Sequence, residues 1–327
     1  MQLVASLGTL ILQLLPIITF FVAGVLVRQQ LLRQWSGDVL RLRQFQRSLN
    51  LVLMEVFLPA IAFLSMARLP LDVGWRLGWV PVLGLTVALL AMLINHWLLA
   101  LIPGLGGDER RALEMLAPWS NTVIVGLPTV ATFLGSELLY IPFLETSFVW
   151  TLILGPLLIH RVARASVLWT SIQPLLRSLW FWAIPLGIAW GILEWPLSGV
   201  GLGILERARE AFLAFGLLVV GLGFDPDRLR PRHSRHLPYI GIAISGAVKL
   251  LLCPLLALLM AIPVGLPTDV AAAFAITVAT PPSLTAYFIG EREGIEPEFM
   301  SFLFALYGVL FFVTILVVQA VLLPLFT

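Results

Sequence analysis

Cysteine and charged residues are scarce in this sequence. The 327-residue chain has one cysteine, Cys253, and only 12% of its residues are charged, whereas 60% are hydrophobic. A single cysteine excludes a disulfide framework within the chain and a metal site built from cysteines. With a mean hydropathy of +1.00, the chain is more apolar than soluble domains of this length, so we expect an integral membrane protein.

Motifs of common enzyme classes are also lacking. The sequence has no HExxH zinc motif, no GxSxG nucleophile elbow and no Walker A loop. Its four histidines do not cluster within one apolar run, and no basic domain or recognition motif favours nucleic acid. We therefore expect neither an enzyme, nor a cofactor, nor a nucleic-acid partner.

Long apolar runs dominate what is present. Ten runs of about 20 residues are each long enough to cross a hydrocarbon core about 30 Å thick. The connections between them are too short to hold a soluble domain, so we predict ten transmembrane helices. The runs lie near Leu3–Val27, Leu49–Met66, Trp75–Ile102, Leu113–Leu134, Leu139–Ile159, Leu179–Trp195, Ala208–Phe224, Leu237–Ile262, Val270–Ile289 and Phe299–Leu323.

Arginine is distributed unevenly among the connections and termini. Fifteen of the nineteen arginines fall in odd-numbered connections, and four fall in even-numbered connections. Positively charged connections stay in the cytoplasm, so both termini are expected outside it. Each half then has five spans, an odd number, and the halves must be inverted relative to each other. We predict five-helix repeats at residues 1–160 and 179–327, joined by a short cytoplasmic linker at residues 161–178.

The first connection, Arg28–Arg47, is rich in arginine and leaves two interpretations open. It is either an amphipathic helix that recruits anionic lipid or a partner, or the positive-inside signal on a solvated face. Both interpretations place the segment at the cytoplasmic surface.

Two adjacent prolines interrupt the ninth run, within TVATPPSLTAYFIG. Pro281 and Pro282 have no amide hydrogen, so the carbonyls of Thr277 and Val278 lose their helical partners. Interrupted backbone at membrane depth is stable only where it packs in protein or lines a wet cavity. We therefore predict that the ninth helix is broken at a functional position.

The fourth run has a similar pattern, SNTVIVGLPTVATFLG, with Asn121 and Pro128 in mid-span. At a constant offset of 155 positions, Phe133–Gly135 aligns with Phe288–Gly290, and Pro142 aligns with Pro297. Two interrupted spans in corresponding positions of two halves indicate a transporter binding site. The alternative is a pair of proline-kinked structural helices in a receptor or other membrane protein.

Two charged residues inside apolar runs are candidates for a functional role. Lys249 is in the middle of the eighth run and must face the interior of the helix bundle. Three roles stay open for it: neutralising the carbonyl ends of broken helices, contacting substrate, or carrying a coupled proton. Glu55, four residues before Pro59, is either a proton-coupling carboxylate or a side chain that reaches the cytoplasmic surface.

Uncharged polar side chains gather at the two interruptions. Asn121 offers two donors and one acceptor, which suits a carboxylate on one side and a freed carbonyl on the other. Thr280 and Ser283 add hydroxyl groups at the ninth-run interruption. We regard Asn121 as the leading candidate for substrate contact.

Several motifs resemble those of the auxin efflux carrier family, which includes plant exporters and bacterial permeases. They are LPIITFFVAGVLVRQQLL, NLVLMEVFLPAIAFLSM, SNTVIVGLP, FLAFGLLVVGLGFD, AVKLLLCPLLALL and VATPPSLTAYFIGEREG, and they span nearly the whole chain in the family's order. The resemblance implies two inverted five-helix repeats, similar to the bile-acid symporter and sodium/proton antiporter architecture. Helices 1, 2, 6 and 7 would form a scaffold, and helices 3–5 and 8–10 a moving transport unit around crossed, broken helices 4 and 9.

The resemblance also implies particular site residues. The family's polar residue in helix 4 matches Asn121, its crossing proline there matches Pro128, and its proline pair in helix 9 matches Pro281 and Pro282. The chain lacks the long central hydrophilic loop of the plant exporters, retaining only Arg161–Arg177. Bacterial relatives resemble carriers of small carboxylates such as malate or malonate.

We therefore expect a cell-membrane transporter of a small organic anion that works by elevator-type alternating access. The alternatives are a cation-coupled symporter of the bile-acid type and a non-transporting membrane sensor on the same scaffold. Besides the lipid bilayer, its expected partners are the anion and a proton or sodium coupling ion, with a homodimer left open. The candidate substrate-binding residues are Asn121, Thr122, Pro128, Thr280, Pro281, Pro282 and Ser283, and the charge-compensation or proton-coupling residues are Lys249 and Glu55.

Overall fold

The computed structural model describes residues 2–70, 74–146, 176–229, 237–283, 286, 295 and 297–325. These residues form helices and no strand, apart from one isolated backbone bridge. The helices are α1 (Gln2–Gln34), α2 (Val39–Val52), α3 (Leu58–Ala67), α4 (Gly74–Leu77), α5 (Trp79–Ala100), α6 (Gly107–Leu116), α7 (Leu127–Leu134), α8 (Tyr140–Thr146), α11 (Leu179–Ile192), α12 (Gly199–Gly223), α13 (Tyr239–Ala247), α14 (Cys253–Val264), α15 (Thr268–Val278) and α17 (Pro297–Val317).

Five of the helical stretches are long and apolar enough to cross a membrane. Three shorter apolar helical stretches accompany them, at Thr122–Leu134, Leu179–Ile192 and Thr268–Val278. The chain is thus an all-α, multi-pass membrane protein. The five long stretches are Gly8–Gln34, Val39–Ala67, Trp79–Ala100, Tyr239–Val264 and Glu298–Leu325.

Several helix boundaries differ from the predicted apolar runs. Helix α1 continues past Val27 to Gln34, and α12 begins at Gly199 rather than at Ala208. The α12 extension is apolar up to Leu205 and is followed by the charged pair Glu206 and Arg207. The α1 extension, Arg28–Gln34, is rich in Arg and Gln, which favour helix but lower the local hydropathy. The first connection is therefore helical on both sides of a turn at residues 35–38. The linker at 161–175 and the ends of the fifth and ninth runs lie outside the described residues.

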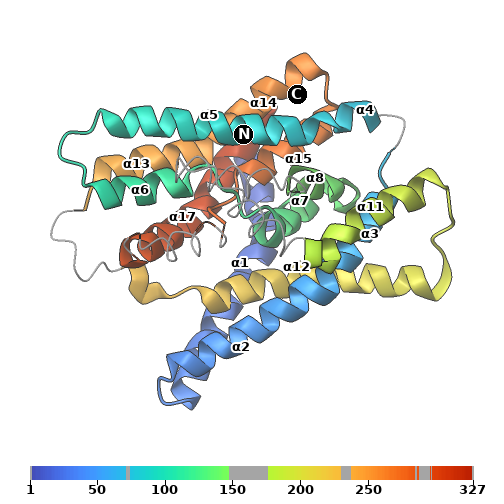
Figure 1. The fold of residues 1–327 in the computed structure, drawn as a ribbon, viewed down its shortest axis with the longest axis horizontal. Coiled ribbons are helices and arrows are strands. Elements are labelled where there is room, and N and C mark those ends of the chain that lie inside the picture. The colour runs from blue at the N-terminus through green and yellow to red at the C-terminus, as the bar shows by residue number, and fades with distance from the viewer. Residues whose placement is uncertain are drawn as a thin grey trace.

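Small residues let two helix pairs pack closely, α1 against α12 and α3 against α11 (Figure 1). A Cβ atom built on Gly24 of α1 would lie 2.9 Å from the Gly221 Cα of α12. A Cβ atom on Gly187 of α11 would lie 2.8 Å from the Cβ of Met66 in α3. Such close approach of backbones is a common way for membrane helices to associate.

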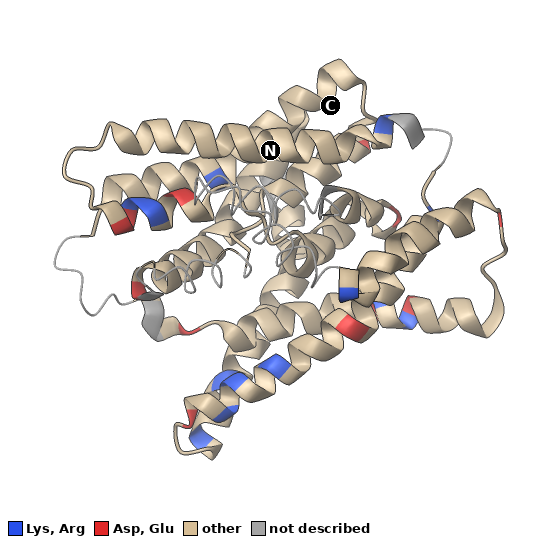
Figure 2. Ribbon diagram, viewed as in Figure 1, with Lys and Arg blue, Asp and Glu red and all other residues tan. Residues whose placement is uncertain are grey.

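Two ion pairs lie at the ends of these packed helices. Arg28 of α1 pairs with Asp225, just after α12, at 2.9 Å, and Arg68, just after α3, pairs with Glu206 of α12 at 2.8 Å. Charged residues also gather in the α1–α2 hairpin and in α6, while most of the ribbon is uncharged (Figure 2). Helix α12 differs from the other long helices, because Glu206, Arg207, Arg209 and Glu210 lie within it.

Within the described residues, four π-helical turns each lie directly before a Leu-Pro or Cys-Pro pair. In each, the residue before the proline donates its N–H to the carbonyl five positions earlier, as Leu127 does to Thr122. A proline removes one helical hydrogen bond and crowds the preceding turn, and a local π-turn re-forms the hydrogen bonding around it. The pairs are η1 (Leu53–Phe57) with Pro59, η3 (Thr122–Gly126) with Pro128, η6 (Val248–Leu252) with Pro254 and η7 (Val318–Leu322) with Pro324.

The fourth run is interrupted beside Asn121, as predicted, but not at Pro128. Pro128 lies inside the helical stretch Thr122–Leu134, which η3 keeps continuous. The interruption is at residues 117–121, between α6 and η3. The expectation that Pro128 marks the crossing is therefore wrong, because a single proline is accommodated by the π-turn that precedes it.

Candidate functional site: the crossing of two interrupted helices

The interruptions of the fourth and ninth runs meet in space, although 160 positions separate Asn121 from Pro281. The Asn121 N–H donates to the Pro281 carbonyl at 2.8 Å, and the Ser283 N–H donates to the Trp119 carbonyl at 3.2 Å. Ser120 and Pro282 form an antiparallel bridge between these two bonds. We call this pairing of residues 119–121 with residues 281–283 the crossing.

The carbonyls freed by the proline pair both have new partners. The Thr277 carbonyl accepts a hydrogen bond from the Thr280 hydroxyl at 2.8 Å. The Val278 carbonyl accepts two, from the Ser120 hydroxyl at 3.2 Å and from the Lys249 ammonium at 3.1 Å. A buried carbonyl without a partner is costly, so these contacts make the interrupted backbone stable inside the protein.

Lys249 is the only lysine in the chain, and its side chain is fully buried. It lies in the π-turn η6, and its Nζ atom is 2.5 Å from Ser120 Oγ and 3.1 Å from the Val278 carbonyl. One contact belongs to the fourth-run interruption and the other to the ninth. The Val278 carbonyl ends α15, where the helix dipole is negative. The geometry therefore favours neutralisation of a half-helix end among the three roles left open by the sequence.

Asn121 lies at the start of the helical stretch Thr122–Leu134 and is only 6% exposed. Both backbone groups of Asn121 are hydrogen-bonded. Its N–H donates to Pro281, and its carbonyl accepts from the N–H groups of Val125 and Gly126 at 3.2 and 3.1 Å. Its side-chain nitrogen, Nδ2, is buried and has no hydrogen-bond partner among the described residues. The first N–H groups of the helical stretch and the positive end of its dipole lie at the same place.

The predicted hydroxyl residues lie at the crossing, but they bond mainly to nearby backbone. Thr122 Oγ1 donates to the Ser120 carbonyl at 3.4 Å, and Thr280 Oγ1 is engaged with Thr277. Ser283 Oγ accepts from the Ala286 N–H at 3.1 Å. These hydroxyls hold the local backbone, whereas the Asn121 amide keeps a buried donor available.

Pro128 and Glu55 do not join the crossing. Glu55 lies in η1 with an exposed side chain, whereas the crossing is buried. Pro128 lies seven residues beyond Asn121, about 10 Å along the helix, and borders a separate cavity of about 250 Å³. That cavity lies between α1, α7 and α12 and is lined by Pro16, Ile17, Phe20, Pro128, Ala131, Thr132, Glu210, Leu213, Ala214 and Leu217.

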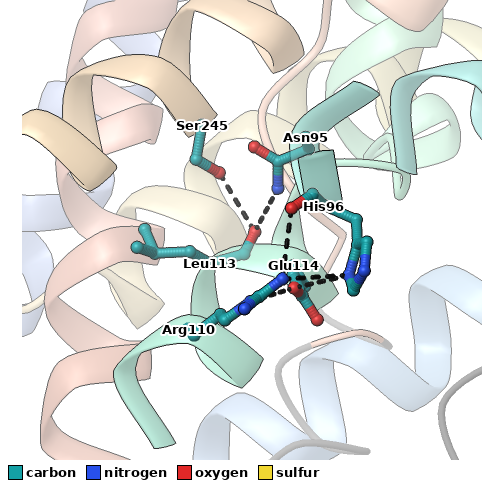
Figure 3. A network of polar contacts seen from close by, with 6 residues as sticks. All are labelled: Asn95, His96, Arg110, Leu113, Glu114 and Ser245. Carbon is teal, nitrogen blue, oxygen red and sulfur yellow. Dashed lines mark hydrogen bonds and ion pairs between the residues drawn. The ribbon is translucent and has the colours of Figure 1, made fainter. Parts of the chain in front are cut away.

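A polar network that the sequence did not indicate holds the end of α6, the half-helix that leads into the crossing (Figure 3). The Leu113 carbonyl accepts from Asn95 Nδ2 of α5 at 3.1 Å and from Ser245 Oγ of α13 at 3.0 Å. Both side chains are fully buried. The network therefore attaches α6 to the two helices beside it.

The same network has a charged part nearer the surface (Figure 3). One oxygen of Glu114 lies 2.8 Å from Arg110 Nε and 2.9 Å from His96 Nδ1, and Arg110 also donates to the His96 carbonyl at 3.2 Å. The sequence signal was Asn95-His96 within an apolar run, but its partners are 14–18 positions away on another helix.

No protein-family model matches this chain, and no curated protein matches its sequence. Among the described residues, no group of three His, Cys, Asp or Glu side chains is placed to hold a metal ion. The functional assignment therefore rests on the crossing.

Proposed function

We propose that this protein is a secondary transporter of a small organic anion such as a carboxylate, of the auxin efflux carrier type. The observation that carries the proposal is the crossing, where two interrupted helices meet around a buried Asn121 amide donor. That donor has no hydrogen-bond partner in the part of the chain that the structure describes. Interrupted helices of this kind form the substrate sites of many secondary transporters.

The local charge supports an anion as the substrate. The positive end of the helical stretch beginning at Thr122 and the N–H donors of Asn121 lie together, and both suit a carboxylate. Lys249 adds a positive charge, because its ammonium donates a hydrogen bond to Ser120, the residue next to Asn121. A cationic substrate at the same place would be repelled by the helix end and by Lys249.

We further propose ten spans in two inverted five-helix repeats, in a cell membrane, with both termini outside the cytoplasm. The interruptions at Ser120 and Pro282 are paired with each other, and Pro142 and Pro297 occupy early positions in α8 and α17. The arrangement supports a repeat because the two members of each pair lie 155–162 positions apart.

The packing also supports a division into a scaffold and a moving unit. Helices α1, α3, α11 and α12 pack mainly against one another, and α14 packs against α5 and α15. The cavity beside Pro128 lies where α7 faces α1 and α12, at the boundary between these groups. In the proposed cycle, the group that carries the crossing moves along the scaffold and exposes the anion to each side in turn.

Asn121→Ala is expected to weaken binding of the transported anion roughly ten- to a hundred-fold or more. It removes one or two hydrogen bonds to a charged group, each worth about 1.5–3 kcal/mol, and about 1.4 kcal/mol corresponds to tenfold in affinity. Isothermal titration of the purified protein with the carboxylate that it transports would measure the change.

A matched control is Asn50→Ala, because Asn50 also has a buried side-chain atom without a partner but lies in α2. It should leave anion affinity unchanged. Asn121→Asp should weaken binding more than Asn121→Ala, because it adds a negative charge. Unchanged affinity in both Asn121 variants would exclude the crossing as the anion site.

The proposed orientation predicts the outcome of reporter fusions. A reporter fused after Arg235, in an arginine-rich connection, should behave as cytoplasmic, and one fused after Thr327 should behave as external. Alkaline phosphatase and green fluorescent protein report opposite sides and control for each other. A cytoplasmic C-terminus would contradict either the ten-span count or the orientation.

A further inference from the structure

The Lys249 ammonium is bound in the way that proteins bind a small metal cation. Two of its partners, Ser120 Oγ at 2.5 Å and the Val278 carbonyl at 3.1 Å, are neutral oxygen atoms. They come from the two different interruptions, so the ammonium joins both sides of the crossing. Secondary transporters with interrupted helices hold their coupling cation on unwound carbonyls and half-helix C-terminal ends, and Val278 is the last residue of α15.

The ammonium differs from a free cation in that it cannot leave. It is tethered to η6 by four methylene groups and is fully buried. An ammonium has three donors and no acceptor, so neutral oxygens suit it as they suit sodium or potassium. A tethered cation occupies its oxygen site at every stage of a transport cycle, without binding from solution.

We propose that the Lys249 ammonium is a built-in replacement for a coupling metal cation. It occupies a monovalent-cation site formed by Ser120 Oγ and the Val278 carbonyl, so transport requires neither sodium nor potassium. Removal of the side chain opens that site to a free cation. The statement about coupling rests on the proposed transport function, whereas the cation site itself does not.

The test compares Lys249→Ala with Lys249→Met. Alanine leaves space for a small cation beside Ser120 and Val278, whereas methionine removes the charge but fills much of the space. Thermal unfolding of the purified protein is followed in sodium, potassium or methylammonium chloride, with choline chloride at equal ionic strength as the reference.

Lys249→Ala should melt about 2 °C or more higher in at least one small-cation salt than in choline chloride, because the cation binds only the folded protein. The melting temperature of the wild type should be the same in all four salts, and so should that of Lys249→Met, although the two proteins differ from each other. Adding Ser120→Ala to Lys249→Ala should remove the cation effect. Equal melting of Lys249→Ala in all four salts, or an equal small-cation effect in Lys249→Met, would overturn the cation site.

Measurements on the wild type keep the proposal testable if Lys249→Ala does not fold. Carboxylate uptake into liposomes should proceed at the same rate with sodium, potassium or choline as the only cation outside. Uptake that requires sodium or potassium would overturn the built-in cation while leaving the transporter assignment intact. A cation effect on Lys249→Ala without uptake of any carboxylate would support the cation site and contradict the transport function.

Discussion

Pro281→Ala combined with Pro282→Ala is expected to give a well-folded protein that does not transport. The two new N–H groups can bond to the Thr277 and Val278 carbonyls and extend α15 through the interruption. The backbone pairing with Asn121 and the Lys249 contact to Val278 would then be lost. The new helical hydrogen bonds would replace these contacts, so the double variant should unfold at a temperature equal to or above that of the wild type.

Pro59→Ala is the matched control for this double variant. Pro59 also interrupts an apolar run, but η1 accommodates it and it lies outside the crossing. It should therefore retain transport. Thermal unfolding and anion uptake into liposomes are measured on the three proteins side by side, and normal uptake by the double variant would show that the interruption is not needed.

Lys249→Met is expected to lose both stability and transport. It leaves the Val278 carbonyl with only the Ser120 bond of 3.2 Å and removes the positive charge at the end of α15. Losing a charged hydrogen bond at a buried site costs about 1.5–3 kcal/mol. The melting temperature should therefore fall clearly, together with anion uptake.

Lys249→Arg separates the charge from the shape of the side chain. It keeps the positive charge and donors for the Val278 carbonyl, so it should retain much of the transport and more stability than Lys249→Met. A different result for Lys249→Met, with wild-type stability but no anion binding, would show that the ammonium is a substrate ligand. The neutralising role assigned to it would then be wrong.

The sequence predicted the membrane class and an interruption in both the fourth and the ninth run, but Pro128 does not mark the fourth-run interruption, and proline chemistry explains why. Pro281 and Pro282 remove two consecutive donors, and the ninth helix ends before them. Pro128 removes one donor, and η3 restores the helix around it. A single proline in an apolar run therefore does not by itself predict a break, because a π-turn can accommodate it.

The pairing of Asn121 with Pro281 could be expected from the repeated pattern, but the role of Ser120 could not. Ser120 contacts Lys249 and Val278, and both contacts depend on how η6 approaches the crossing. The network at Leu113 was missed for the same reason. Its members Asn95 and Ser245 lie in different apolar runs, and no spacing in the sequence relates them.

Helix α12 shows a limit of reading membrane spans from hydropathy. The charged pair Glu206 and Arg207 lies within this helix, so the apolar run was predicted only from Ala208 onward. The helix nevertheless begins at Gly199 and continues through this charged pair, because Glu and Arg favour helix about as well as leucine does.

Uptake of radiolabelled carboxylates into liposomes that contain the purified protein tests the transport function most directly. A panel of small mono- and dicarboxylates is first screened for thermal stabilisation, and each hit is measured with the wild type, the double proline variant and protein-free liposomes. We expect saturable uptake of at least one carboxylate by the wild type and none above the protein-free level by the double proline variant. Folded wild-type protein that neither binds nor takes up any carboxylate, or equal uptake by both proteins, would contradict the assignment of the crossing as a transport site.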